Sequence, residues 1–188
     1  ILLDTAGKLF ARTGYQKGGP ENYVSHLKGL LGQKEGRDSI LKALDTAEGD
    51  GRKEAIAKAA TDFREWKILG DYKDEVVAAA EKHLASVEGD EAKVMELGLV
   101  LEALAGENKG HGSPLVPFGK LLEQVVVLDP ENKHGLLVKY LGDLYQATQV
   151  DKDEEGKVTQ KPLLAVRYVP LVKSLTEGQC EPSGSFFA

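Results

Sequence analysis

Apolar side chains recur every three or four residues along most of this chain, which is the spacing of amphipathic helices. The pattern is clearest in the middle, where it predicts one helix from about Arg52 to Ile68 and a second from about Tyr72 to Val87. Residues 91–130 hold a further pair, in which Gly106 ends the first helix and Gly110–Pro114 forms the loop. The inward positions of these helices are Ala55, Ala59, Phe63, Trp66, Val76, Val77, Ala80, Leu84, Val94, Leu97, Leu101, Leu104, Val116, Leu121, Leu122, Val125 and Leu128.

The flanking sequence continues the pattern. Four more helices are predicted, at Leu2–Thr13, Pro20–Leu31, Arg37–Ala47 and Glu131–Gln149. Gly32–Gly36 separates the middle two, and the stretch Asp151–Lys161 is polar. Residues Pro162–Leu175 fit a helix interrupted at Pro170 as well as they fit an extended segment, because their valines and tyrosine favour strands.

A turn signal repeats at an interval of 40 residues. Glu48-Gly49-Asp50 recurs as Glu88-Gly89-Asp90, and one more step reaches Leu128-Asp129-Pro130. Glycine suits the left-handed residue beyond a helix end, and aspartate suits the cap of the next helix. Pro130 would then occupy the first turn of a helix capped by Asp129.

These signals predict an all-α fold of stacked antiparallel helix pairs, because a helix pair cannot bury its apolar face alone. The stack is either a short α-solenoid or an irregular helical bundle in which the 40-residue spacing is chance. The helical-repeat domain would span residues 1–175, and residues 176–188 would form a C-terminal tail.

Three short motifs resemble a known repeat family. Trp66, Leu69 and Gly70 lie at a Trp-x2-Leu-Gly spacing. Leu97-Gly98 followed by Leu101, and Leu141-Gly142 followed by Tyr145, are similar to a Leu-Gly-x2-Tyr core. These motifs resemble tetratricopeptide repeats, whereas the period of about 40 is closer to HEAT-like repeats. The resemblance implies a concave surface that binds a peptide or another subunit.

Composition and charge exclude several functions. Among 188 residues the formal net charge is −6 and basic residues are interleaved with acidic ones, which argues against a nucleic-acid binder. No apolar run approaches the roughly 20 residues of a transmembrane helix, while peripheral association with a membrane complex stays open. The single cysteine, Cys180, excludes an intrachain disulfide and leaves the compartment undetermined. Because Ile1 replaces an initiator Met, the chain is either processed or a fragment.

Four motifs resemble catalytic or ligand-binding sites, but each lacks a residue that the site would need. Asp151–Gly156 resembles the start of a calcium loop, but its twelfth position is Pro162, which cannot bind the ion. Gly110-His111-Gly112 lacks the third glycine of a dinucleotide loop, and Ala6-Gly7-Lys8-Leu9 lacks the flanks of a phosphate loop. Cys180 has acidic neighbours and no adjacent base. We therefore expect no catalytic residue, metal or cofactor.

The four histidines, His26, His83, His111 and His134, have no metal-ligand spacing. Surface or interhelical positions are expected for His83 and His134, and His111 is the one to test for function.

Two alternatives for function remain, besides a self-sufficient enzyme. The first is a non-catalytic interaction or accessory subunit of a larger assembly, which binds protein partners. Phe186 and Phe187 of its tail would either anchor it to a neighbouring subunit or fold back onto the chain's own core. The second is a helical ligand- or substrate-binding domain, part of a longer enzyme, with its pocket near Gly106–Pro114.

Overall fold

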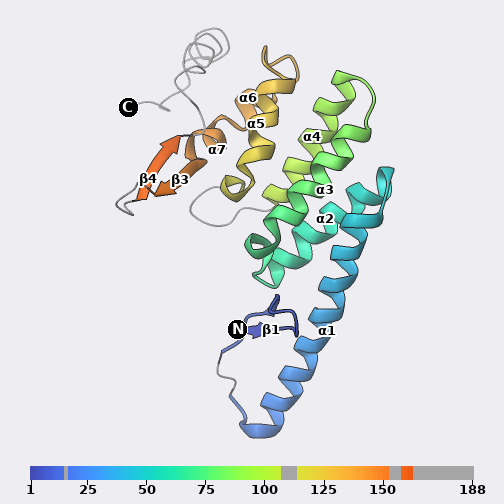
Figure 1. Ribbon diagram of the computed structural model, residues 1–188, viewed down its shortest axis with the longest axis vertical. Coiled ribbons are helices and arrows are strands. Elements are labelled where there is room, and N and C mark those ends of the chain that lie inside the picture. Colours follow the sequence, from blue (N-terminus) through green and yellow to red (C-terminus); the bar gives the residue numbers. More distant parts are fainter. Residues whose placement is uncertain (15–16, 107–113, 153–157, 163–188) are drawn as a thin grey trace.

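The computed structural model describes residues 1–14, 17–106, 114–152 and 158–162 and is mostly helical (Figure 1). The helices are α1 (Gly19–Thr46), α2 (Gly49–Glu65), α3 (Lys73–Ser86), α4 (Asp90–Ala105), α5 (Gly119–Leu128), α6 (Leu136–Lys139) and α7 (Leu141–Gln146), with 3-10 turns η1 (Leu69–Tyr72) and η2 (Val116–Phe118). Two antiparallel hairpins join β1 (Leu2–Leu3) with β2 (Leu9–Ala11) and β3 (Thr148–Lys152) with β4 (Val158–Pro162).

The long helices form stacked antiparallel pairs, as predicted. Successive helices pack against each other, and α2 contacts α1, α3 and α4, while α3 contacts α1, α4 and α5. This arrangement places α1, α3 and α5 in one row and α2 and α4 in a second row (Figure 1). The short α6 and α7 pack against α5.

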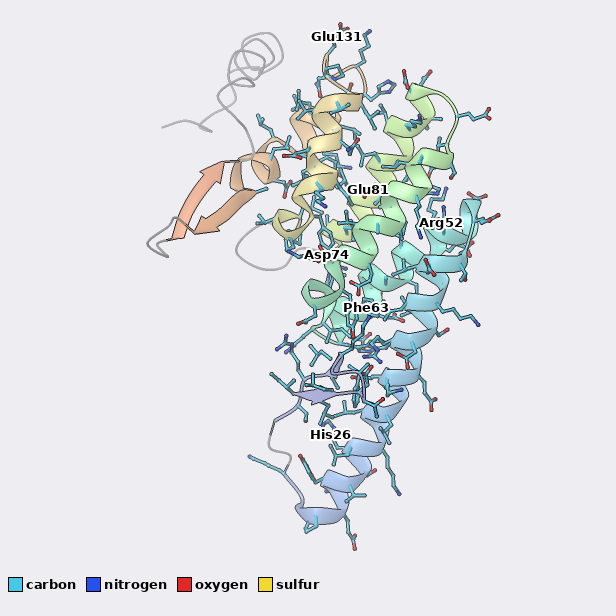
Figure 2. All side chains as sticks on the ribbon, in the orientation of Figure 1. His26, Arg52, Phe63, Asp74, Glu81 and Glu131 are labelled. Carbon is cyan, nitrogen blue, oxygen red and sulfur yellow. The ribbon has the colours of Figure 1, made fainter. Side chains whose placement is uncertain are left out.

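A continuous apolar core runs between the rows. Phe63 of α2, labelled in Figure 2, is fully buried. Its ring contacts those of Trp66 and Tyr72 at centroid distances of 6.0 and 5.1 Å. Most of the predicted inward positions are buried; Trp66 and Leu128 are only half-buried against the core, and Val116 is also half-buried. The helical period of apolar residues therefore located this interior correctly.

The predicted N-terminal helix over residues 2–13 is wrong, because this segment forms the β1–β2 hairpin. The carboxylate of Asp4 accepts the backbone N–H groups of Ala6 and Lys8 at 2.9 and 2.8 Å. A short polar side chain that bonds its own backbone in this way competes with helix formation.

The predicted break at Gly32–Gly36 is also wrong, because α1 continues through it. A glycine in a helix interior costs about 1 kcal/mol relative to alanine, which packing on either side can offset. Leu30 and Arg37 are buried on the two sides of this stretch. At Gly36 a β-carbon would come within 2.8 Å of Trp66 Cη2, so close packing favours glycine there.

The predicted helix junctions hold in part. Gly49 and Gly89 have positive φ values of 50° and 86°, as expected for glycine between helices. Asp50 and Asp90, however, lie inside the first turns of α2 and α4 and do not cap them; the N-cap residues are Glu48 and Gly89. The acidic side chains still lie near the positive ends of the helix dipoles.

The predicted helix over residues 131–149 is confirmed only in its middle, where α6 and α7 lie; a turn precedes them, and β3 begins at Thr148. Pro130 is in that turn, not in a first helical turn. Asp129 is 2% exposed, and its carboxylate accepts the backbone N–H groups of His134 and Leu136 at 3.2 and 3.1 Å. It therefore organises the turn that leads into α6.

Two predictions about the C-terminal region receive no test. Residues 163–175, which were compatible with a helix or an extended segment, lie outside the described residues. The same holds for the boundary at residue 176 and for the tail of residues 176–188.

Candidate functional site

The outward face of α4 carries large apolar side chains. Met95 is 62% and Leu99 is 50% exposed, and they lie four residues apart on one side of the helix. Their neighbours Leu97 and Leu101 are fully buried on the opposite side. We call Met95 and Leu99 the α4 surface.

Contacts on both flanks fix the α4 surface. On one flank, Arg64 of α2 donates to the carbonyl oxygens of Ala103 and Leu104, which satisfies acceptors at the C-terminal end of α4. On the other flank α6 lies close, since a β-carbon at Gly98 would be 3.2 Å from Leu136 Cδ2. The surface therefore lies on a helix that is held on both flanks.

The neighbouring helices α2 and α3 expose smaller or polar side chains. Outward residues of α3 are Asp74, Ala78, Glu81, Lys82 and Ala85, two of which are labelled in Figure 2. Those of α2 include Glu54, Ala57, Lys58 and Thr61. Among the outward faces of α2, α3 and α4, the face of α4 is therefore the one with two large apolar residues.

A polar cluster joins α4 to α2 and α3 beneath this face. Glu96 lies 3.0 Å from Nε2 of His83, which is 3% exposed, and accepts a hydrogen bond of 3.1 Å from Lys53. The hydrogen bond with His83 and the nearby Lys53 ammonium lower the pKa of Glu96 below its ordinary value. His83 thus occupies an interhelical position, which agrees with the expectation from the sequence.

A second buried polar cluster surrounds Arg37 of α1, whose side chain is 2% exposed. Its Nη2 lies 2.6 Å from Asp4 Oδ2, and its Nη1 donates to the carbonyl oxygens of Lys8 and Leu9 at 3.2 and 3.1 Å. Nη1 also donates to the hydroxyl of Tyr72, 3.0 Å away, and that hydroxyl donates to Leu9 O. Arg37 therefore ties the hairpin to α1 and to η1.

The electrostatics of the Arg37 cluster are those of a structural clamp. Backbone hydrogen bonding from Lys8 and the Arg37 guanidinium lower the pKa of Asp4. Burial would lower the pKa of Arg37, but its hydrogen bonds to Asp4, Asp38 and Tyr72 outweigh burial and raise it. Both groups are held in their charged forms, so neither is poised to exchange a proton near neutral pH.

Two shallow depressions occur on the described surface. One, of about 350 Å³, is lined by Pro20, Glu21, Val24, Ser25 and Lys28 of α1. The other, of about 250 Å³, lies between the start of α4 and the turn after α5, and its lining includes Asp90, Pro130 and His134.

Several candidates from the sequence are not brought into a site. Phe186, Phe187, Cys180 and His111 lie outside the described residues. Within the described ranges, no His, Cys, Asp or Glu side chains form a group of three suited to a metal ion. No helix in those ranges combines the length and the apolar character needed to cross a bilayer.

Reasoning from the sequence missed Met95 and Leu99 as candidate binding residues. The available signal was an excess of apolar residues, because α4 carries Val94, Met95, Leu97, Leu99, Val100, Leu101 and Leu104. One helix face cannot bury all of them, and a helix that is apolar on several faces needs more than one partner surface.

Comparison with known proteins gives no match to a family model, to a curated protein or to a solved structure.

Proposed function

We propose that this protein is a non-catalytic interaction module, an accessory subunit that binds a protein partner through the α4 surface. The observation that carries the proposal is the exposure of Met95 and Leu99 in the middle of a helical layer. Scattered apolar residues are common on protein surfaces, but two large ones side by side on one helix offer a contiguous contact. Methionine suits such contacts because its flexible side chain adapts to a partner.

The charges around the α4 surface define the partner. Glu91 and Glu102 are exposed on the same stripe of α4, one on each side of the apolar pair. Lys139 of α6 lies 3.9 Å from Glu102, so that this carboxylate is only weakly engaged. A partner segment with apolar residues in the middle and basic residues at its ends complements this pattern, for example an amphipathic helix.

The tail adds a second proposed contact. Phe186 and Phe187 would anchor the same partner, and a chain that lacks residues 182–188 tests this role by its affinity. The resemblance to helical repeats supports a peptide- or subunit-binding role for the stack as a whole.

The test compares matched variants in capture from the native source, with quantitative mass spectrometry of the bound proteins. Met95→Glu/Leu99→Glu should remove a stoichiometric partner, because two apolar contacts are lost and acidic charge is added. We expect a loss of at least about a hundredfold in affinity, at about 1.5 kcal/mol for each buried side chain.

Val127→Glu is the control, since Val127 is 65% exposed on α5, in the other row. Circular dichroism should be unchanged in both variants because the three residues are exposed. If the double variant and the control retain the same partner equally, the α4 surface is not the docking site.

A further inference from the structure

The side of α1 that faces away from the stack has a regular charge pattern. Glu21, Lys28, Glu35 and Lys42 are all exposed and follow one another at intervals of seven residues. Leu30, Arg37 and Leu44, each two residues after one of the last three, are buried. Two residues turn a helix by about 200°, so the charged row lies opposite the buried row.

These four charges have no partner within the described chain. The ion pairs of α1 involve other residues: Lys34 pairs with Asp38 at 3.0 Å, and Asp45 with Lys82 at 3.0 Å. The row alternates in sign over the whole helix of 28 residues, a length of about 42 Å. Within one chain, this alternation of charge therefore forms no ion pairs among the described residues.

The row is complementary to itself in the antiparallel sense. If two copies of α1 cross with a two-fold axis between Leu31 and Gly32, Glu21 faces Lys42 of the second copy, and Lys28 faces Glu35. Symmetry repeats both pairs, which gives four ion pairs of opposite sign and none of like sign. Parallel alignment in register would instead place like charges together, so the pattern specifies the antiparallel orientation.

The residues beside the charged row are small enough for a second α1 helix to approach closely. Ser25, Gly32, Ser39 and Thr46 are exposed small residues at the same interval of seven. A β-carbon at Gly32 would meet no atom within 4 Å, so packing within the chain gives no reason for glycine there. The shallow depression between Glu21 and Lys28 lies on the same face. Leu31, 55% exposed, lies beside the two-fold axis, where a second copy covers it.

We propose that the outward face of α1 binds a second copy of this chain antiparallel, through reciprocal pairs between Glu21 and Lys42 and between Lys28 and Glu35. Figure 1 shows the N-terminal half of α1 extending beyond the stack, which leaves this face accessible. None of residues 19–29 is buried in the chain.

The size of the face sets the strength of the dimer. A helix about 42 Å long and about 10 Å wide offers on the order of 400 Å² per copy, against about 800 Å² in a standard stable interface. The dimer is therefore weak and concentration-dependent, and salt weakens it because its pairs lie in solvent.

Sedimentation equilibrium of the full chain, up to about 1 mM protein and at about 0.05 M and about 0.5 M salt, tests the proposal. We expect a monomer–dimer equilibrium that weakens at least about tenfold at high salt. Glu21→Lys/Glu35→Lys should be monomeric, as should Lys28→Glu/Lys42→Glu, because each variant sets like charges against one another. A mixture of these two variants should form a heterodimer, which structural damage could not explain.

Matched controls locate the contact. Glu54→Lys/Glu81→Lys changes the net charge equally on α2 and α3 and should dimerise like the parent chain. Gly32→Leu should raise the melting temperature yet lose the dimer. A monomer under all conditions, or a heterodimer mixture that stays monomeric, overturns the proposal. The Met95→Glu/Leu99→Glu variant should still dimerise, so failure here is distinguishable from failure of partner binding at the α4 surface.

Discussion

The helical stack and the N-terminal hairpin differ in what fills the space between their elements. Apolar side chains fill the stack from Ile40 to Ala147, and most of its buried residues come from helices adjacent in sequence. The hairpin buries few apolar residues of its own, namely Phe10 and Ala11 against Leu30. Its attachment depends instead on the guanidinium of Arg37, which binds groups 28 to 35 residues distant in sequence.

Because of this difference, we expect the two regions to unfold in different ways. An apolar core loses stability in proportion to the volume removed and unfolds as a unit. A buried ionic clamp is sensitive to the loss of one partner, because the remaining charges are then left unpaired in a poorly solvated place. The hairpin should therefore detach locally while the stack stays folded.

The largest expected effect is that of Phe63→Ala in the stack. The substitution removes a fully buried ring that contacts Trp66 and Tyr72, and should cost about 4 kcal/mol in the free energy of unfolding. Urea unfolding followed by circular dichroism measures this change. Phe63→Leu is the matched control, with an expected cost near 1 kcal/mol. Equal costs for the two substitutions would mean that the ring does not fill the core as described.

A smaller and local effect is expected for Arg37→Met. The methionine fills similar space but leaves the carboxylate of Asp4 without its guanidinium partner and takes one donor from each of the carbonyls of Lys8 and Leu9. We expect about 3 kcal/mol less protection against opening of the hairpin. Hydrogen exchange of the amide of Asp4, which donates to Lys8 O at 2.9 Å, reports this opening.

Arg37→Lys keeps the charge without the planar fork and should give an intermediate result. Amides in α4 should exchange as in the parent protein in both Arg37 variants. If protection in α4 falls as much as in the hairpin, the two regions form one cooperative unit.

The smallest effect at neutral pH is expected for Tyr140→Phe, which probes a polar atom inside the apolar region. Tyr140 is 4% exposed, and its hydroxyl has no hydrogen-bond partner among the described residues. Burial raises the pKa of Tyr140 from 10.0 to about 12, with Glu102 and Asp143 adding to the shift. The protonated Tyr140 therefore makes its full contribution to the free energy of unfolding below pH 10, and this contribution is lost as the pH rises towards 12.

Urea unfolding at neutral pH and near pH 11 tests this sign. Tyr140→Phe should change stability by less than about 1 kcal/mol at neutral pH and should lose less than the parent chain at alkaline pH. Tyr23→Phe is the control, because Tyr23 is 41% exposed and its replacement should leave the alkaline loss unchanged. If the Tyr140 variant and the parent chain lose the same stability at alkaline pH, burial of the Tyr140 hydroxyl is not the cause of that loss.

Much of the stack could be predicted from periodicity. The inward positions of α3, Val76, Val77, Ala80 and Leu84, are all buried as expected, because each contact row follows from the 3.6-residue turn. Gly49 and Gly89 marked real helix junctions, since only glycine adopts their positive φ freely. The assignment to a particular repeat family remains a proposal.

The candidate sites were less predictable. Met95 and Leu99 have the composition of core residues, and which apolar residues of α4 stay outside depends on where α2 and α6 dock. Arg37 was predicted as the start of a helix, whereas it is the buried centre of a clamp. Nothing adjacent to it in sequence reveals Lys8, Leu9 and Tyr72 as its partners.

The all-α class, the central helix pairs and most of their buried faces could be predicted from the sequence, because they follow from local spacing and local turn chemistry. Only the tertiary structure decided that α1 continues through Gly32 and Gly36 and that residues 2–11 form a hairpin. It also decided which charges and apolar residues remain outside. These features depend on contacts between distant segments, whose free energy outweighs weak local preferences.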